Sequence, residues 1–210
     1  MPEELLLSQW GALYWIVAVT ASLSVHEFSH ALIADLLGDS TPRKEGRLTL
    51  VPFPHIDPLG FLLFLFFGIG WAKPVRFEPE SLRYRSIGKT LVALAGPFSN
   101  LVMMSLTVAI AKALNAAGAL GPDAMALVTA LITVNATLVV VNIIPVPPFD
   151  GSKLLLDFLA SLHAERLIDD ITKYGPFIVL GALFLDGSVG YHIVQRLLTF
   201  VITLAKSYIL

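Results

Sequence analysis

Hydrophobic residues along this chain gather in long runs that short polar or proline-rich segments interrupt. Three of the runs, at about 7–37, 90–117 and 124–144, reach the length of roughly 20 apolar residues that a helix needs to cross a bilayer. The first run ends at Gly38-Asp39, a pair that commonly stops a helix. The pattern therefore predicts three transmembrane helices.

A fourth apolar run, at 59–71, is too short to span a bilayer. It follows an extended-looking segment at 48–51, and Pro52, Pro54 and Pro58 exclude a regular helix directly before it. An apolar run of this length between proline-rich ends predicts a re-entrant or interfacial segment.

Beyond the third span, the pattern predicts an amphipathic helix at about 152–162 and an apolar C-terminal segment at 174–210. Asp186-Gly187 marks a turn in that segment, which then forms either two short helices or one kinked span. We therefore expect an all-α polytopic membrane protein made of one domain, 1–210. Its core would be a three-helix bundle within about 7–162, joined by the short re-entrant or extended segment and one or two C-terminal helices.

The composition agrees with a lipid environment. Hydrophobic residues make up 56% of the chain and charged residues only 14%, and the mean hydropathy is +0.77. Soluble domains are about a quarter charged. The net charge of −2, without a long basic run, argues against a nucleic-acid partner. Because Glu3 and Glu4 precede the first run where a signal peptide carries positive charge, we expect this run to be retained as a span.

The distribution of Lys and Arg predicts the orientation, since cytoplasmic loops carry an excess of these residues. The region 39–89 holds eight of them and 145–173 holds three, whereas the loop at 118–123 and the residues before Trp10 hold none. We therefore expect the N-terminus outside and both basic regions in the cytoplasm. The distribution fits the cell membrane of a prokaryote.

Three ionisable side chains interrupt the first apolar run, in the order His26-Glu27-Phe28-Ser29-His30. Residues i and i+4 share one face of a helix, so both imidazoles can bind one metal ion while Glu27 reaches a water molecule beside it. Ionisable groups within a bilayer are costly and by default mark function. A polar cluster used for helix packing or proton relay is the simpler alternative. Because the chain has no cysteine, a zinc site here must use His, Asp or Glu.

A catalytic zinc ion needs three protein ligands and an open position. Asp150 is the main candidate for the third ligand, because it follows a proline-rich break after the third span and lies on the same predicted side as His26 and His30. Gly151 would let the backbone turn so that the carboxylate faces inward. Taken alone, Asp150 also fits an ordinary N-cap before Ser152. Together with the histidine pair and the charge distribution, the ligand interpretation is favoured.

These motifs, in this order, resemble the site-2 protease family of intramembrane metalloproteases. Besides the histidine pair, two segments are typical of that family: Ala95-Gly96-Pro97-Phe98-Ser99-Asn100, and Asn142-Ile143-Ile144-Pro145-Val146-Pro147-Pro148-Phe149-Asp150-Gly151. The resemblance implies a catalytic core of three transmembrane helices, Zn²⁺ held by the two histidines and the aspartate, and cleavage of substrate transmembrane helices. The chain resembles the minimal members of the family, which carry no PDZ or CBS domain.

Four further polar residues have two explanations each. The Asn142 amide is suited to holding an oxyanion or substrate carbonyl, which the resemblance favours, but a structural role beside the proline-rich break explains it equally well. Asn100 has the same two explanations, with helix packing through Gly96 favoured. His55 and Asp57 either join the active site or form an interfacial turn in which Asp57 acts as a cap.

Two other functions remain as alternatives. A metal or proton transporter would use the same buried His and carboxylate groups, and an inactive homologue would act as a scaffold, although the intact motif argues against the latter. A protease should lose turnover and keep zinc when Glu27 becomes Gln, whereas a transporter should tolerate this change. The partners expected for a protease are a membrane-protein substrate helix and the lipid bilayer. The sequence carries no signal for an oligomeric state.

Overall fold

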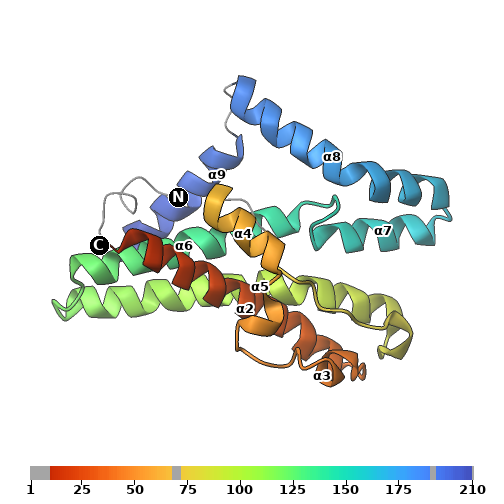
Figure 1. Cartoon of the computed structure of the whole chain (residues 1–210), viewed down its shortest axis with the longest axis horizontal. Helices are drawn as coiled ribbons and strands as arrows, with labels where there is room; N and C mark the ends of the chain where they lie inside the picture. Colours follow the sequence, from red (N-terminus) through yellow and green to blue (C-terminus); the bar gives the residue numbers. More distant parts are fainter. Residues whose placement is uncertain (1–9, 68–71, 190–192, 210) are drawn as a thin grey trace.

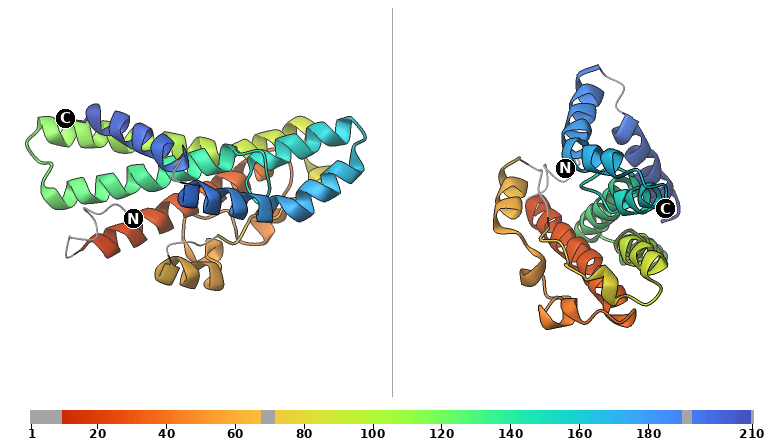
Figure 2. Two further views of the ribbon diagram at one scale, coloured as in Figure 1. Left: turned by 90° about the horizontal axis from the view of Figure 1, so that it is seen from above. Right: turned by 90° about the vertical axis from the view of Figure 1, so that its right-hand side faces the viewer.

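The computed structural model describes residues 10–67, 72–189 and 193–209. Three long helices form its body: α2 (Gly11–Leu36), α5 (Arg85–Ala116) and α6 (Pro122–Ile143). They run side by side along the long axis of the molecule, as the views in Figures 1 and 2 show. Among the described residues, these are the helices long and apolar enough to cross a membrane. The prediction of three spans in an all-α membrane protein is confirmed, although the start of the predicted first span lies outside the described residues.

Alanine side chains allow the three helices to pack closely. Among the described residues of these helices, six alanines have no exposed surface: Ala18, Ala31, Ala34, Ala93, Ala111 and Ala130. Within lipid, helix association depends on close backbone approach, because the lipid is as apolar as the side chains it would replace. The outer face of α5 instead exposes large apolar side chains, among them Phe98, Leu106 and Ile110. This face is suited to contact with lipid.

The connection between α2 and α5 packs on the outer side of α2 (Figure 2). It contains α3 (Thr41–Lys44), η1 (Phe53–His55), α4 (Pro58–Phe67) and η2 (Pro79–Ser81). The segment predicted to be extended, 48–51, forms bends, and within the described residues the one β-type pairing is an isolated antiparallel bridge between Ile56 and Ala72. The re-entrant or interfacial position of the short apolar run stays a prediction.

The chain ends in three helices, α7 (Gly151–Ser161), α8 (Glu165–Val189) and α9 (Ile193–Ser207). The α7 helix agrees with the predicted amphipathic helix, and the alternative of two C-terminal helices is the one observed. The turn predicted at Asp186-Gly187 is wrong, because α8 begins at Glu165 and continues through both residues. A single glycine costs a helix only about 1 kcal/mol, which the rest of a long helix offsets. The last helix, α9, returns to pack on α5 and α6.

Candidate metal centre

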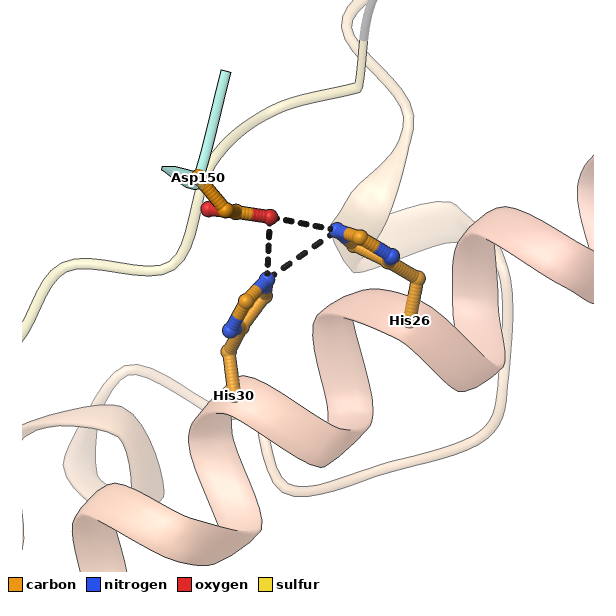
Figure 3. Close-up of side chains that lie close together, drawn as sticks. All are labelled: His26, His30 and Asp150. Carbon is orange, nitrogen blue, oxygen red and sulfur yellow. Dashed lines mark hydrogen bonds and ion pairs between the residues drawn. The ribbon is translucent and has the colours of Figure 1, made fainter. Parts of the chain in front are cut away.

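His26 and His30 project from one face of α2 toward Asp150, which directly precedes α7 (Figure 3). The Nε2 atoms of His26 and His30 lie 3.0 Å and 3.1 Å from Oδ2 of Asp150, and 3.0 Å from each other. Both imidazoles are buried, and Asp150 is 9% exposed. Of the described residues, these three form the group whose ligand atoms are close enough to hold one metal ion. Residues 120 positions apart in sequence thus meet inside the helix bundle.

Hydrogen bonds on the far side of each ring determine which nitrogen faces this centre. The Nδ1 of His30 lies 2.6 Å from the Val92 carbonyl, which can only accept, so Nδ1 carries the proton. The Nδ1 of His26 lies 2.6 Å from Oδ1 of Asn100, whose amide nitrogen donates to Oδ1 of Asn135. A neutral imidazole protonated at Nδ1 presents the lone pair of Nε2. Both rings therefore direct a lone pair at Asp150.

This set of donor atoms fits a divalent cation. Two nitrogen lone pairs and a carboxylate oxygen, each about 3 Å from the others, repel one another unless a positive charge lies between them. Ligand atoms at about 2.0–2.2 Å from a tetrahedral zinc ion are roughly 3.3 Å apart. The observed spacing is close to that value. The three residues thus match the ligand number and chemistry of a catalytic zinc site.

Comparison with known proteins gives the family. Residues 100–185 match the family model described as Peptidase family M50. The chain is 34% identical over 178 residues to YwhC of Bacillus subtilis (strain 168), named as a candidate zinc metalloprotease, a match that covers 81% of this chain and 80% of YwhC. The chain belongs to the site-2 protease family, peptidase family M50. It is a zinc metalloprotease of this family and an integral membrane protein.

A second relative agrees with this assignment. The chain is 30% identical over 195 residues to Rip2 of Mycolicibacterium smegmatis (strain ATCC 700084 / mc(2)155), also named as a candidate zinc metalloprotease. This match covers 81% of the present chain and 73% of Rip2. No solved structure was found to match the chain.

In this site-2 family member, Asp150 is held by contacts at both its carboxylate and its backbone. It occupies the N-cap position of α7 but makes no side-chain capping bond, so the ordinary cap interpretation does not describe it. Its Oδ1 accepts a hydrogen bond from Nζ of Lys153 at 2.7 Å, which leaves Oδ2 toward the histidines. Its backbone N–H donates to Oδ1 of Asn142 at 3.4 Å, and the Asn142 amide nitrogen donates to the Leu138 carbonyl. Asn142 thus braces the backbone of Asp150.

Two glycines make room for the centre. A Cβ atom on Gly96 would lie 2.4 Å from Nε2 of His30 and 2.5 Å from Cε1 of His26, so both imidazoles rest against the α5 backbone. A Cβ atom on Gly151 would lie 2.5 Å from the Ile143 carbonyl oxygen. Glycine at 151 is therefore required by the close approach of α6 to α7, rather than by the backbone turn that the sequence suggested.

Glu27 is buried beside the two histidines and is held by the connection between α2 and α5. Its Oε2 accepts a hydrogen bond from the Val75 N–H at 3.0 Å and lies 3.8 Å from Nη2 of Arg47. The same guanidinium donates to the carbonyls of Pro54 and Lys73. Burial lowers the pKa of Arg47, the Glu27 charge opposes this, and the group stays a cation. One arginine thus ties two parts of the connection to Glu27.

His55 and Asp57 do not join the metal cluster. Nε2 of His55 donates to the Thr49 carbonyl at 2.8 Å, and burial lowers the pKa of this imidazole, so it is neutral near pH 7. Oδ1 of Asp57 accepts a hydrogen bond from the Gly60 N–H at 2.8 Å, in the first turn of α4. This contact agrees with the capping interpretation of Asp57.

Sequence reasoning missed the hydrogen-bond network behind His26. Asn100 was assigned mainly to helix packing, yet its side chain links the His26 ring to Asn135, whose amide nitrogen donates to Oγ of Ser22. The spacing of Gly96 and Asn100 is a signal that could have indicated this contact, since both lie on one face of α5. No comparable signal singles out Asn135.

Substituting Gly96 by alanine is expected to abolish stable zinc binding, because the added methyl group overlaps both imidazoles. The zinc content of the purified protein, measured by mass spectrometry of the metal, should fall at least about tenfold, the scale seen when ligand orientation is disturbed. Gly181→Ala is the matched control, since nothing lies within 4 Å of a Cβ atom there. Wild-type zinc content in Gly96→Ala would contradict the close contact.

Substituting Asn100 by alanine is expected to weaken zinc binding by roughly 10- to 100-fold, because the His26 ring loses the partner that fixes its tautomer. Competition with a chelator of known affinity measures the change. Asn115→Ala removes an amide on the same helix that contacts the Ile209 carbonyl, away from the centre, and should leave zinc affinity unchanged. Equal affinities for the two variants would show that Asn100 does not orient His26.

Proposed function

We propose that this chain is an intramembrane metalloprotease that hydrolyses peptide bonds in or near the transmembrane segments of membrane-protein substrates. The observation that carries the proposal is the convergence of His26, His30 and Asp150 inside a bundle whose three helices are long and apolar enough to span a bilayer. The family membership supports a metalloprotease, and the position of the cluster within the spans supports a substrate bond at membrane depth.

The proposed zinc ligands are His26, His30 and Asp150, and an ion held there would supply Lewis acidity toward the scissile carbonyl. Glu27 is the proposed general base and acid, because it follows the first ligand directly and its carboxylate is buried beside the cluster. It accepts a proton from the attacking water and passes that proton to the leaving amine. The carbonyls of a helix are already hydrogen-bonded, so the substrate must unwind locally, at residues with weak helix propensity.

Asn142 has a positioning role in this proposal. Both ends of its amide are engaged, with the Leu138 carbonyl and with the backbone of Asp150. The amide nitrogen reaches an oxyanion only after leaving the Leu138 carbonyl. The oxyanion role of Asn142 therefore stays a prediction, and its contact with Asp150 supports a role in holding the third ligand.

Substituting Glu27 by glutamine is expected to leave about one zinc ion per chain and to lower turnover at least 100-fold, within the range typical of general acid–base catalysis. Asp150→Ala is the complementary variant and should lose zinc, because two imidazoles alone do not complete the ligand set. Zinc content and cleavage of single-span substrates in detergent micelles, with and without a chelator, measure both effects.

The transporter alternative gives the opposite results in this experiment. A transporter would move metal across vesicle membranes, tolerate Glu27→Gln and cleave no substrate. Chelator-insensitive cleavage, or full turnover by Glu27→Gln, would contradict the proposed roles of the metal and of Glu27.

We also propose that the N-terminus lies outside a prokaryotic cell membrane and that the metal cluster is near the cytoplasmic face. The basic connection with α3 and the start of α7 lie toward one end of the three-helix body, and the turn between α5 and α6 lies at the other (Figure 1). The bacterial origin of the relatives supports the type of membrane. The Lys and Arg distribution supports the direction.

Because the chain has no cysteine, single-cysteine labelling tests this orientation directly. Glu45 directly follows α3, Ala119 lies in the turn between α5 and α6, and both residues are exposed. In intact cells, a membrane-impermeant maleimide should label Ala119→Cys, and it should label Glu45→Cys only after the membrane is opened. The reverse pattern would invert the orientation.

A further inference from the structure

A cavity of about 190 Å³ lies between α2, α6 and the connection that carries η1 and α4. Helix α2 contributes Leu23 and Ser24 to its wall, and α6 contributes Val134 and Leu138. The roles assigned above to the metal cluster and Glu27 do not use this space. Its position and its lining indicate what it binds.

The hydroxyl groups of the two helix walls are satisfied within their own helices. The Thr20 hydroxyl donates to the Ile16 carbonyl at 2.7 Å, and the Ser24 hydroxyl donates to the Thr20 carbonyl at 2.7 Å. On α6, the Thr137 hydroxyl donates to the Thr133 carbonyl at 2.8 Å. The helix walls therefore offer mainly apolar groups to an occupant. A cavity of this kind selects an apolar group.

Both helix walls lead to the proposed active site. On α2, Ser24 lines the cavity and Glu27 lies one turn further along the same face. On α6, Leu138 lines the cavity and Asn142 lies one turn further along, where it contacts Asp150. Since residues three or four apart share a helix face, the two faces that line the cavity continue toward the reacting groups.

The third wall of the cavity, which the connection between α2 and α5 forms, also leads to the proposed active site. Ile56 and Ala72 line the cavity and pair with each other as an antiparallel bridge. Three residues beyond Ala72, the Val75 N–H donates to the Glu27 carboxylate. All three walls thus connect the cavity to Glu27 or to the residue that braces Asp150.

His55 adds one unsatisfied polar group to this wall. The residue is 1% exposed, its Nε2 donates to the Thr49 carbonyl, and its Nδ1 has no partner among the described residues. In this tautomer Nδ1 is an acceptor. A buried acceptor without a donor is costly. The mainly apolar lining, beside the groups proposed for peptide hydrolysis, indicates an apolar side chain of the substrate as the occupant.

Resting on the function proposed above, we infer that this cavity is the substrate subsite for one large apolar side chain, phenyl-sized or branched aliphatic, beside the scissile bond. An apolar cavity of about 150 Å³ holds benzene, so the present one accommodates a side chain of the Phe or Leu class. The subsite would make cleavage selective for the residue next to the bond.

Filling the cavity tests this inference. The substrates are otherwise identical single-span peptides with Phe, Leu or Ala at each position flanking the scissile bond, and kcat/KM is measured in micelles. Wild type should prefer Phe or Leu over Ala at one position by roughly 10- to 100-fold, the value of burying such a side chain. Thr20→Phe should remove this preference and still cleave the Ala substrate. Val17→Phe adds the same ring at an exposed position of α2 and should keep the preference.

Phe61→Ala provides the opposite change, since it enlarges the cavity from the third wall. It should shift the preference toward a further substrate of the same series with Trp at that position, while zinc content in every variant reports an intact centre. Equal losses for all substrates in Thr20→Phe, or an unchanged preference, would overturn the subsite, as expected if the cavity only holds a lipid chain. Absence of cleavage of every substrate by zinc-loaded wild type would instead overturn the proposed function itself.

Discussion

The close contact between α2 and α5 at Gly96 is the constraint on which the centre depends. Both imidazoles lie against the α5 backbone, where a single methyl group would displace them. The same approach lets α5 supply the acceptors for both Nδ1 atoms, from Val92 and Asn100. In a bilayer an unpaired imidazole N–H has no water to bond, so each ring must find its partner within the protein. The same contact between α2 and α5 therefore determines both the packing of the two helices and the orientation of the two imidazoles.

The position of Asp150, the candidate third ligand, depends on the path of the chain after α6. Helix α6 ends at Ile143, just before the residue that precedes Pro145, and Gly151 allows α7 to begin close against the Ile143 carbonyl. An ion pair between Lys89 of α5 and Asp157 of α7 ties the new helix to the bundle. The carboxylate of Asp150 is thus positioned by contacts from two spans and by its own helix, although no helix face contains all three candidate ligands.

Much of this arrangement follows from local sequence signals. The three spans were predictable because each one is a continuous apolar run, and the histidine pair because i and i+4 positions share a face. The meeting of Asp150 with the histidine pair was expected because the Lys and Arg distribution predicts that both lie on the same side of the membrane. Each of these inferences considers a single helix or a single membrane boundary and requires no knowledge of contacts between distant segments.

The features that escaped prediction depend on contacts between distant segments. Asn135 braces Asn100 only because α5, α6 and α2 meet at Ser22, and no periodicity encodes that meeting. Arg47 appeared as one of eight basic loop residues, yet it is buried against Glu27. A count of Lys and Arg in each loop treats every basic residue as exposed. It therefore cannot distinguish a basic residue that determines membrane orientation from one, such as Arg47, that contacts a site residue. The prediction of a turn at Asp186-Gly187 failed for the opposite reason. A local signal for a helix end was overridden by the long helix that contains both residues.

The connection between α2 and α5 contacts both the proposed proton-transfer residue and the proposed substrate subsite. Its Val75 N–H and Arg47 guanidinium hold the Glu27 carboxylate, while Ile56 and Ala72 line the cavity that we assign to the substrate side chain. The bridge between Ile56 and Ala72 and the contacts of Arg47 with Pro54 and Lys73 join these two roles in one unit. In the proposed enzyme, a side chain bound in the cavity would therefore contact the same connection that holds Glu27.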